Sequence, residues 1–140
     1  MTVAGYDLES YTISEDYHSE DELWSAINTV FLSKSRNSTS YKFCFLKAIL
    51  DNIFNVDAQL VLPFYTIFER FTEIYWNLII KFGLKQMPGA KLTVVEKLIR
   101  GCAAKYALCP ETSFDALRNE IKLELCTRVT KECSRFVVGA

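Results

Sequence analysis

Residues 38–83 concentrate the large apolar side chains of this chain and constrain its fold more than any other stretch. They contain seven of the ten phenylalanines, three of the seven tyrosines and one of the two tryptophans. Most of these side chains recur at intervals of three or four residues, which is the spacing of one face of an α-helix. The stretch therefore predicts two core helices and the connection between them, covered by the rest of the chain.

Length and composition place the chain among globular proteins with one core. A chain of 140 residues buries roughly two thirds of its unfolded surface without disulfides or metal ions. Charged side chains interrupt residues 63–82, which excludes a lipid-facing span. The first residues also lack the basic and apolar blocks of a signal peptide. We therefore expect a cytoplasmic protein that does not associate with membranes.

The apolar periodicity predicts an all-α, single-domain bundle of about five helices. Residues 1–20 show no sustained period and are expected to form an acidic arm, flexible or loosely docked, before a helical domain at residues 21–140. Residues 60–62 are expected to be extended. Thr39 or Ser40 is expected to cap the second helix, and Thr93 with Glu96 to form a capping box. The expected helices run from Ser19 to about residue 31, from Ser40 to Phe54, from Pro63 to Gly83, from Thr93 to about residue 108 and from Thr112 or Ser113 to about Val138.

Cysteine and histidine give no catalytic or metal-binding pattern. His18 is the only histidine and lies in the acidic arm, so neither a hydrolytic base nor a usual metal site is available. The cysteines are odd in number and widely spaced, which favours reduced thiols buried in helices. Two pairs are seven positions apart, about 10 Å along a helix, which is too far for both thiolates to bind one zinc ion. The five cysteines are Cys44, Cys102, Cys109, Cys126 and Cys133.

Paired carboxylates occur at Glu69 and Glu73, one helical turn apart. Because Arg70 lies between them and no histidine accompanies them, an ion pair is favoured over a metal site. We expect no cofactor in this chain and no small-molecule substrate.

Charge is distributed unevenly along the chain. Residues 1–33 carry seven acidic residues and no lysine or arginine, whereas residues 34–140 carry sixteen basic and ten acidic residues. An acidic segment near −7 therefore precedes a domain near +6. Such a domain binds polyanions, and the acidic arm would compete with them for the same surface. The alternative is an ordinary solvated surface with a charged tail.

Basic side chains gather in two groups that are candidates for DNA binding. On the last two helices they alternate with Glu120, Glu124 and Glu132, so a solvated face remains the alternative to phosphate binding. The candidates on these helices are Lys97, Arg100, Lys105, Arg118, Lys122, Arg128, Lys131 and Arg135. The smaller group at the start of the core stretch comprises Arg36, Asn37, Lys42 and Lys47.

Two short strings resemble the helical N-terminal region of bacterial HNH endonuclease family proteins. They are residues 37–43 (NSTSYKF), continued by residues 45–51 (FLKAILD), and residues 68–76 (FERFTEIYW). Residues 137–140 are similar to the point where such proteins continue toward the nuclease part. The polar or aromatic residues that carry the resemblance are Asn37, Ser40, Tyr41, Lys42, Arg70, Glu73 and Trp76.

The resemblance implies a role in a DNA nuclease without supplying the catalytic site. An HNH nuclease needs a general-base histidine and ligands for a divalent metal ion, and this chain has no His-Asn-His arrangement. The resemblance thus implies a non-catalytic helical module of a bacterial restriction or defence nuclease that engages DNA or assembles with a downstream nuclease domain. The abrupt apolar ending FVVGA leads us to expect truncation. The alternative function is a protein interaction or dimerisation module without a nucleic-acid role.

Overall fold

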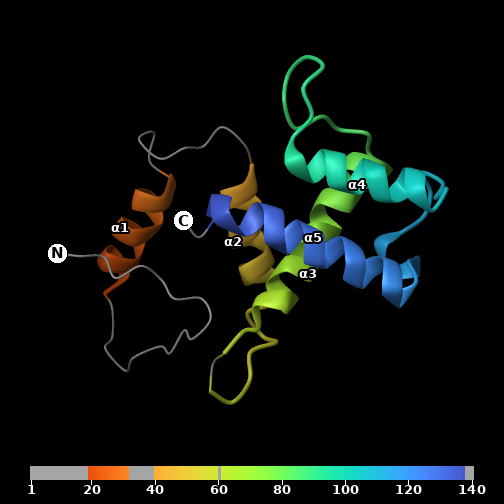
Figure 1. Ribbon diagram of the computed structural model, residues 1–140. Coiled ribbons are helices and arrows are strands. Elements are labelled where there is room, and N and C mark those ends of the chain that lie inside the picture. Colours follow the sequence, from red (N-terminus) through yellow and green to blue (C-terminus); the bar gives the residue numbers. More distant parts are fainter. Residues whose placement is uncertain (1–18, 32–39, 60, 138–140) are drawn as a thin grey trace.

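The chain is all-α in the part that its computed structural model describes, residues 19–31, 40–59 and 61–137 (Figure 1). No strand occurs within these ranges, and Val61 and Leu62, predicted to be extended, lie in a loop. The predicted fold class is therefore confirmed. The helices are α1 (Glu20–Phe31), α2 (Tyr41–Asp51), α3 (Phe64–Trp76), the π-helical turn η1 (Asn77–Lys81), α4 (Val94–Lys105), the 3₁₀ turn η2 (Phe114–Ala116) and α5 (Asn119–Val137).

Helix α3 is the centre of the fold, as its apolar stripe predicts. It packs against α2, α4 and α5, and Phe68, Phe71, Tyr75 and Trp76 are completely buried. The rings of Phe68 and Phe71 lie 5.1 Å apart, and those of Phe71 and Tyr75 lie 5.0 Å apart. Burial of each such side chain contributes about 1.5–3 kcal/mol, so this helix dominates the stability of the core.

Helix α2 is shorter and less buried than its sequence predicts. It ends at Asp51 instead of Phe54, because the side-chain amide of Asn52 donates a hydrogen bond to the carbonyl of Ala48 (2.9 Å). Only one face meets α3, and Phe54 is 96% exposed. Ser40 occupies the N-cap position, but its side chain does not bond a first-turn amide. The predicted cap at Ser40 is therefore wrong, and its alternative, Thr39, lies outside the described residues. The apolar residues that we expected to be buried, and that are exposed, are Phe43, Leu50, Ile53 and Phe54.

The π-helical turn η1 changes which side chains after α3 face the core. The Phe82 amide donates to the carbonyl of Asn77 (3.0 Å), five residues back rather than four. The wider turn rotates the following residues, so that Ile79 is buried while Phe82, predicted to lie on the apolar stripe, is 61% exposed. Gly83 has φ +61° and provides the left-handed C-terminal cap that was predicted.

Helix α4 begins with the predicted capping box. The Glu96 amide donates to Thr93 Oγ1 (3.3 Å), and the Thr93 amide donates to Glu96 Oε1 (3.3 Å). Glu96 is completely buried and also accepts a hydrogen bond from the Gln86 amide (3.1 Å). The helix ends at Lys105, short of the prediction, and Ala107 then adopts a positive φ of 49°, which reverses the chain.

Loss of the Thr93 cap should destabilise the protein measurably. We expect Thr93→Ala to lower the free energy of unfolding by about 0.5–2 kcal/mol, because a buried first-turn amide loses its acceptor. Urea denaturation followed by circular dichroism measures the change. Thr127→Ala, at an exposed position inside α5, is the matched control and should cost less than about 0.5 kcal/mol. Equal effects of the two substitutions would contradict the role of the cap.

Helix α5 begins later than predicted. Ser113 accepts a hydrogen bond from the Ala116 amide (3.3 Å) and caps the short turn η2 rather than a long helix. The chain then turns again, and α5 starts at Asn119.

Helix α1 begins where its acidic first turn predicts. The Glu22 amide donates to Ser19 Oγ (3.3 Å), and the Ser19 amide donates to Glu22 Oε2 (2.9 Å). Figure 1 shows α1 at one end of the molecule, the end farthest from α4. Among the described helices, α1 takes part in none of the extensive helix–helix contacts. The predicted arm, residues 1–20, lies outside the described residues except for Ser19 and Glu20.

Four of the five cysteines are buried as predicted, but Cys109 is exposed in the loop after α4. Burial raises the pKa of Cys126 to about 11 and also raises the pKa of Cys44 and Cys102. We therefore expect one thiol per native chain to react rapidly with a disulfide reagent at pH 8, because the four buried thiols are inaccessible and a raised pKa keeps Cys44, Cys102 and Cys126 protonated. Absorbance of the released thiolate gives the count, and mass spectrometry should locate the label on Cys109. Rapid labelling of two or more cysteines would contradict this packing.

Candidate nucleic-acid interface

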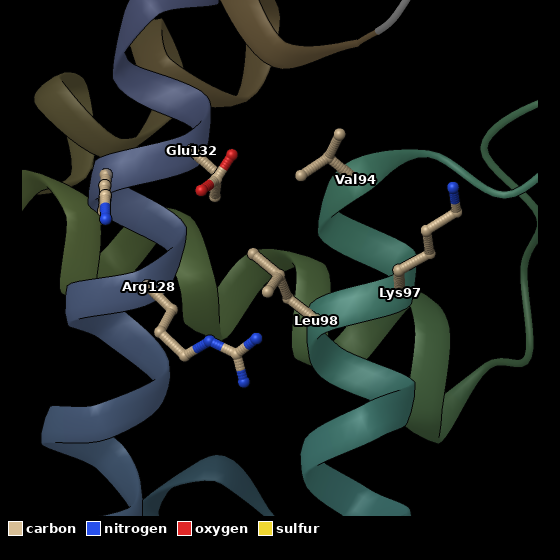
Figure 2. Close-up of a pocket in the computed structure, with 6 residues that line it drawn as sticks. Val94, Lys97, Leu98, Arg128 and Glu132 are labelled. Atoms are coloured by element: carbon tan, nitrogen blue, oxygen red, sulfur yellow. The ribbon is translucent and has the colours of Figure 1, made fainter.

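A groove of about 410 Å³ runs between α4 and α5. Its lining combines three basic side chains, one carboxylate and two aliphatic side chains, and Figure 2 shows them. The lining residues are Val94, Lys97, Leu98, Arg128, Lys131 and Glu132.

Helical spacing places these side chains on facing walls. On α5, Arg128 and Lys131 are three residues apart and so lie on the same side of the helix. On α4, Lys97 precedes Leu98, whose side chain is buried against the core. Figure 2 shows Arg128 on one helix and Lys97 on the other, with Leu98 projecting between the helices. Lys97 on α4 therefore lies across the groove from Arg128 and Lys131 on α5, and the side chain of Leu98 lies between the two helices.

The cations of the groove are not neutralised by neighbouring carboxylates. Within the described ranges, no acidic side chain forms an ion pair with Lys97, Arg128 or Lys131. Glu132 is the only acidic residue among the described lining residues, whose net charge is near +2. Unpaired cations on two walls of a hollow attract an anionic ligand.

A second, smaller hollow continues the seam toward the other end of α4 and is neutralised. Lys105 Nζ lies 2.8 Å from Glu124 Oε1, and the Tyr106 hydroxyl donates to the other oxygen of the same carboxylate. These hydrogen bonds, first from Lys105 and then from Tyr106, hold the pKa of Glu124 below its ordinary value. Arg128 lines both hollows, and among the described residues the second hollow adds no further unpaired cation to it.

The other candidates for DNA binding whose side chains the structure describes do not line this groove. Lys47 pairs with Asp51 (2.9 Å) on α2, and Lys122 lies over the ring of Phe114, 5.4 Å from its centroid. Arg100 and Arg118 are exposed, and Lys42 is half-buried on α2. The remaining three candidates, Arg36, Asn37 and the side chain of Arg135, lie outside the described residues.

Three of the residues that carry the family resemblance form hydrogen bonds that link elements of the fold. The Tyr41 hydroxyl accepts a hydrogen bond from the Val95 amide (3.1 Å), which ties α2 to the first turn of α4. The Ser40 hydroxyl lies 2.6 Å from the Tyr75 hydroxyl. The Trp76 indole donates to the carbonyl of Thr112 (2.9 Å).

Two further resemblance residues, Arg70 and Glu73, form ion pairs on the surface. Arg70 Nη1 lies 2.9 Å from Glu73 Oε2, which confirms the ion pair predicted there, and Arg70 Nε lies 2.9 Å from Asp51 Oδ2. Hydrogen bonds from Lys47 and then from Arg70 hold the pKa of Asp51 below its ordinary value. These charges neutralise one another, so this surface is less suited to an anion than the α4–α5 groove.

Comparison with known proteins identifies no relative of this chain. No protein-family model, curated protein or solved structure matches it. A function for the chain must therefore be argued from the geometry and charge of the groove.

The described residues include neither a cluster of metal ligands nor a helix that could span a membrane. No three histidine, cysteine, aspartate or glutamate side chains there come close enough together to hold a metal ion. The described helices include none with the length and apolar content needed to cross a bilayer.

The candidates chosen from the sequence did not include the two aliphatic residues of the groove lining. Val94 and Leu98 are four residues apart on α4 and flank Lys97, so they form an apolar strip beside a cation. The matching spacing of Arg128, Lys131 and Glu132 on α5 was visible in the sequence. The pairing of these two strips was not visible, because it depends on how the helices pack.

Proposed function

We propose that this chain is a non-catalytic helical module that binds the phosphate backbone of DNA through the α4–α5 groove. The observation that supports this most strongly is the convergence of Lys97, Arg128 and Lys131 on one hollow, where none of them has a carboxylate partner among the described residues. Arginine and lysine are the side chains that neutralise phosphates in DNA-binding proteins, and each such contact releases counterions.

The groove favours backbone contacts over sequence recognition. Lysine and arginine contact phosphate oxygens, and such contacts position a protein on the duplex but carry no sequence information. Among the described residues, the lining has no asparagine or glutamine to contact adenine in the major groove. The proposed module therefore lacks the usual adenine contacts in this lining, and we propose that its cations bind the phosphate backbone.

The resemblance to the helical region of bacterial HNH endonuclease proteins supports a role beside a nuclease. In that setting the helical module would hold the duplex, and a separate domain with a divalent metal ion would cleave it. The proposal assigns no chemical step to the residues of this chain.

Salt-dependent titration tests the proposed function. The full chain is titrated against a fluorescein-labelled 20-base-pair duplex, and anisotropy is recorded at several concentrations between about 50 and 200 mM NaCl. Three phosphate contacts predict a slope of about −2.7 in a plot of log affinity against log salt. Absence of binding at 50 mM NaCl, or an affinity that does not change with salt, would overturn the proposal.

A second candidate function is supported by the apolar face of α2. Leu50, Ile53 and Phe54 are exposed, and they lie at helical spacing on one side of α2 and the turn after it. Large exposed apolar groups of this kind mark protein interaction surfaces. This candidate is a dimerisation or protein interaction module without a nucleic-acid role.

Sedimentation velocity tests this second candidate. If the α2 face mediates self-association, the sedimentation coefficient should rise with protein concentration, and the double substitution Leu50→Ser/Phe54→Ser should abolish the rise. The matched control is Phe82→Ser/Leu84→Ser, which removes two other exposed apolar side chains and should leave association unchanged. A wild-type chain that stays monomeric at about 100 µM would contradict self-association through this face.

A further inference from the structure

The acidic helix α1 is itself a ligand suited to the α4–α5 groove. We propose that α1 docks into this groove through its acidic first turn and competes with DNA, so that the chain regulates its own nucleic-acid affinity. The inference rests on the proposed function and adds its regulation.

Charge makes α1 complementary to the groove. Its first turn consists of Glu20, Asp21 and Glu22, all exposed, and no lysine or arginine occurs anywhere in residues 1–33. The described lining of the groove presents three cations that pair with no described carboxylate, against the one carboxylate of Glu132. Carboxylates, like backbone phosphates, accept charge-assisted hydrogen bonds from arginine and lysine.

The groove also matches the apolar part of α1. Trp24 is 55% exposed and lies one turn after Glu20, and its indole donates to Glu20 Oε1 (3.4 Å). The strip formed by Val94 and Leu98 provides an apolar surface between the cationic walls. A helix with acidic and apolar groups side by side fits such a groove in the helix-in-groove mode.

The helix that follows α1 along the chain, α2, is held against the edge of the groove. The hydrogen bond from the Val95 amide to the Tyr41 hydroxyl (3.1 Å) holds the first residue of α2 against the first turn of α4, next to the groove residue Val94. The nine residues between Phe31 and Tyr41 can span up to roughly 30 Å. A short tether of this kind gives an effective concentration in the millimolar range, so even weak contacts are sufficient for docking.

Docking of α1 does not require the core to rearrange. In the structure α1 lies apart from α4 (Figure 1) and shares no extensive contact with the other described helices. The structure therefore holds the undocked arrangement, in which the groove is open to another anion.

Neutralising the first turn of α1 tests the competition. In the full chain, Glu20→Gln/Asp21→Asn/Glu22→Gln should raise the affinity for the labelled duplex about three- to tenfold at low salt, because the intramolecular competitor is removed. The matched control, Glu111→Gln/Asp115→Asn/Glu120→Gln, makes the same change in net charge at exposed positions outside the groove. An equal rise in both variants would overturn the docking and would leave DNA binding intact.

Nuclear magnetic resonance provides a measurement that does not involve DNA. The backbone amide signals of Lys97, Arg128 and Lys131 should differ between the wild type and the α1 variant, and high salt should move the wild-type signals toward those of the variant. If these shifts occur but the chain does not bind DNA, the docking of α1 is supported and the proposed function is overturned. Unchanged groove signals, or changes at Leu50 and Phe54 instead, would overturn docking in this groove.

Discussion

Replacement of Lys97, Arg128 and Lys131 by glutamine is expected to lower the affinity for duplex DNA roughly 10²- to 10³-fold at about 50 mM NaCl. Each of the three cations lines the groove and has no carboxylate partner in the part of the chain that the structure describes, so we expect each to be available to a phosphate. Glutamine keeps most of the side-chain volume and removes the charge. Anisotropy titration of the variant should also give a salt dependence that is shallower by about 2.7 in slope.

A matched variant separates the groove from net charge. Lys81→Gln/Lys85→Gln/Arg118→Gln removes three exposed cations outside the groove and should change affinity by less than about tenfold. Equal losses in the two triple variants would show that DNA responds to overall charge and would contradict a site between α4 and α5. Circular dichroism should show the same helix content in both variants, because all six positions are on or near the surface.

Trp76→Ala is expected to cause the largest loss of stability, about 3–5 kcal/mol. The indole is completely buried, lies 6.4 Å from the ring of Phe114 and donates to the carbonyl of Thr112 (2.9 Å). The substitution therefore leaves a cavity beside α3 and an unpaired carbonyl in the loop that leads to α5. Urea denaturation followed by circular dichroism measures the loss.

The two tryptophans of the chain provide a matched control. Trp24→Ala removes the same side chain from a position that is 55% exposed and should change the free energy of unfolding by about 0.5 kcal/mol or less. Trp76→Phe fills most of the cavity but lacks the donor, so its loss should be intermediate. Similar losses for Trp76→Ala and Trp24→Ala would contradict a central position for α3.

The sequence predicted the helices and the central one among them because apolar periodicity and capping residues act locally. The capping box at Thr93 and the left-handed cap at Gly83 are examples that the structure confirms. The exposure of Phe82 could not be predicted in this way, because a single π-helical turn shifts the phase of the stripe. Phe54 was misplaced for a different reason: apolar character alone does not show which helix face finds a neighbour.

The sequence predicted which basic residues could form the candidate site, but not where in the fold some of them come together. Lys97 and Lys105 both lie on α4, yet one lines the open groove and the other pairs with Glu124 from α5 (2.8 Å). Lys47 is likewise engaged by Asp51. Which cations remain unpaired depends on contacts between helices, and sequence spacing within one helix does not report them.

The bond between Tyr41 and the Val95 amide has a consequence for hydrogen exchange. First-turn amides of a helix usually lack an intrahelical acceptor and exchange quickly with solvent. The Val95 amide is instead bonded to a buried hydroxyl on another helix (3.1 Å), so its deuterium uptake requires α2 and α4 to separate. Slow exchange at this one amide would therefore report, in the intact protein, how often the edge of the groove comes apart.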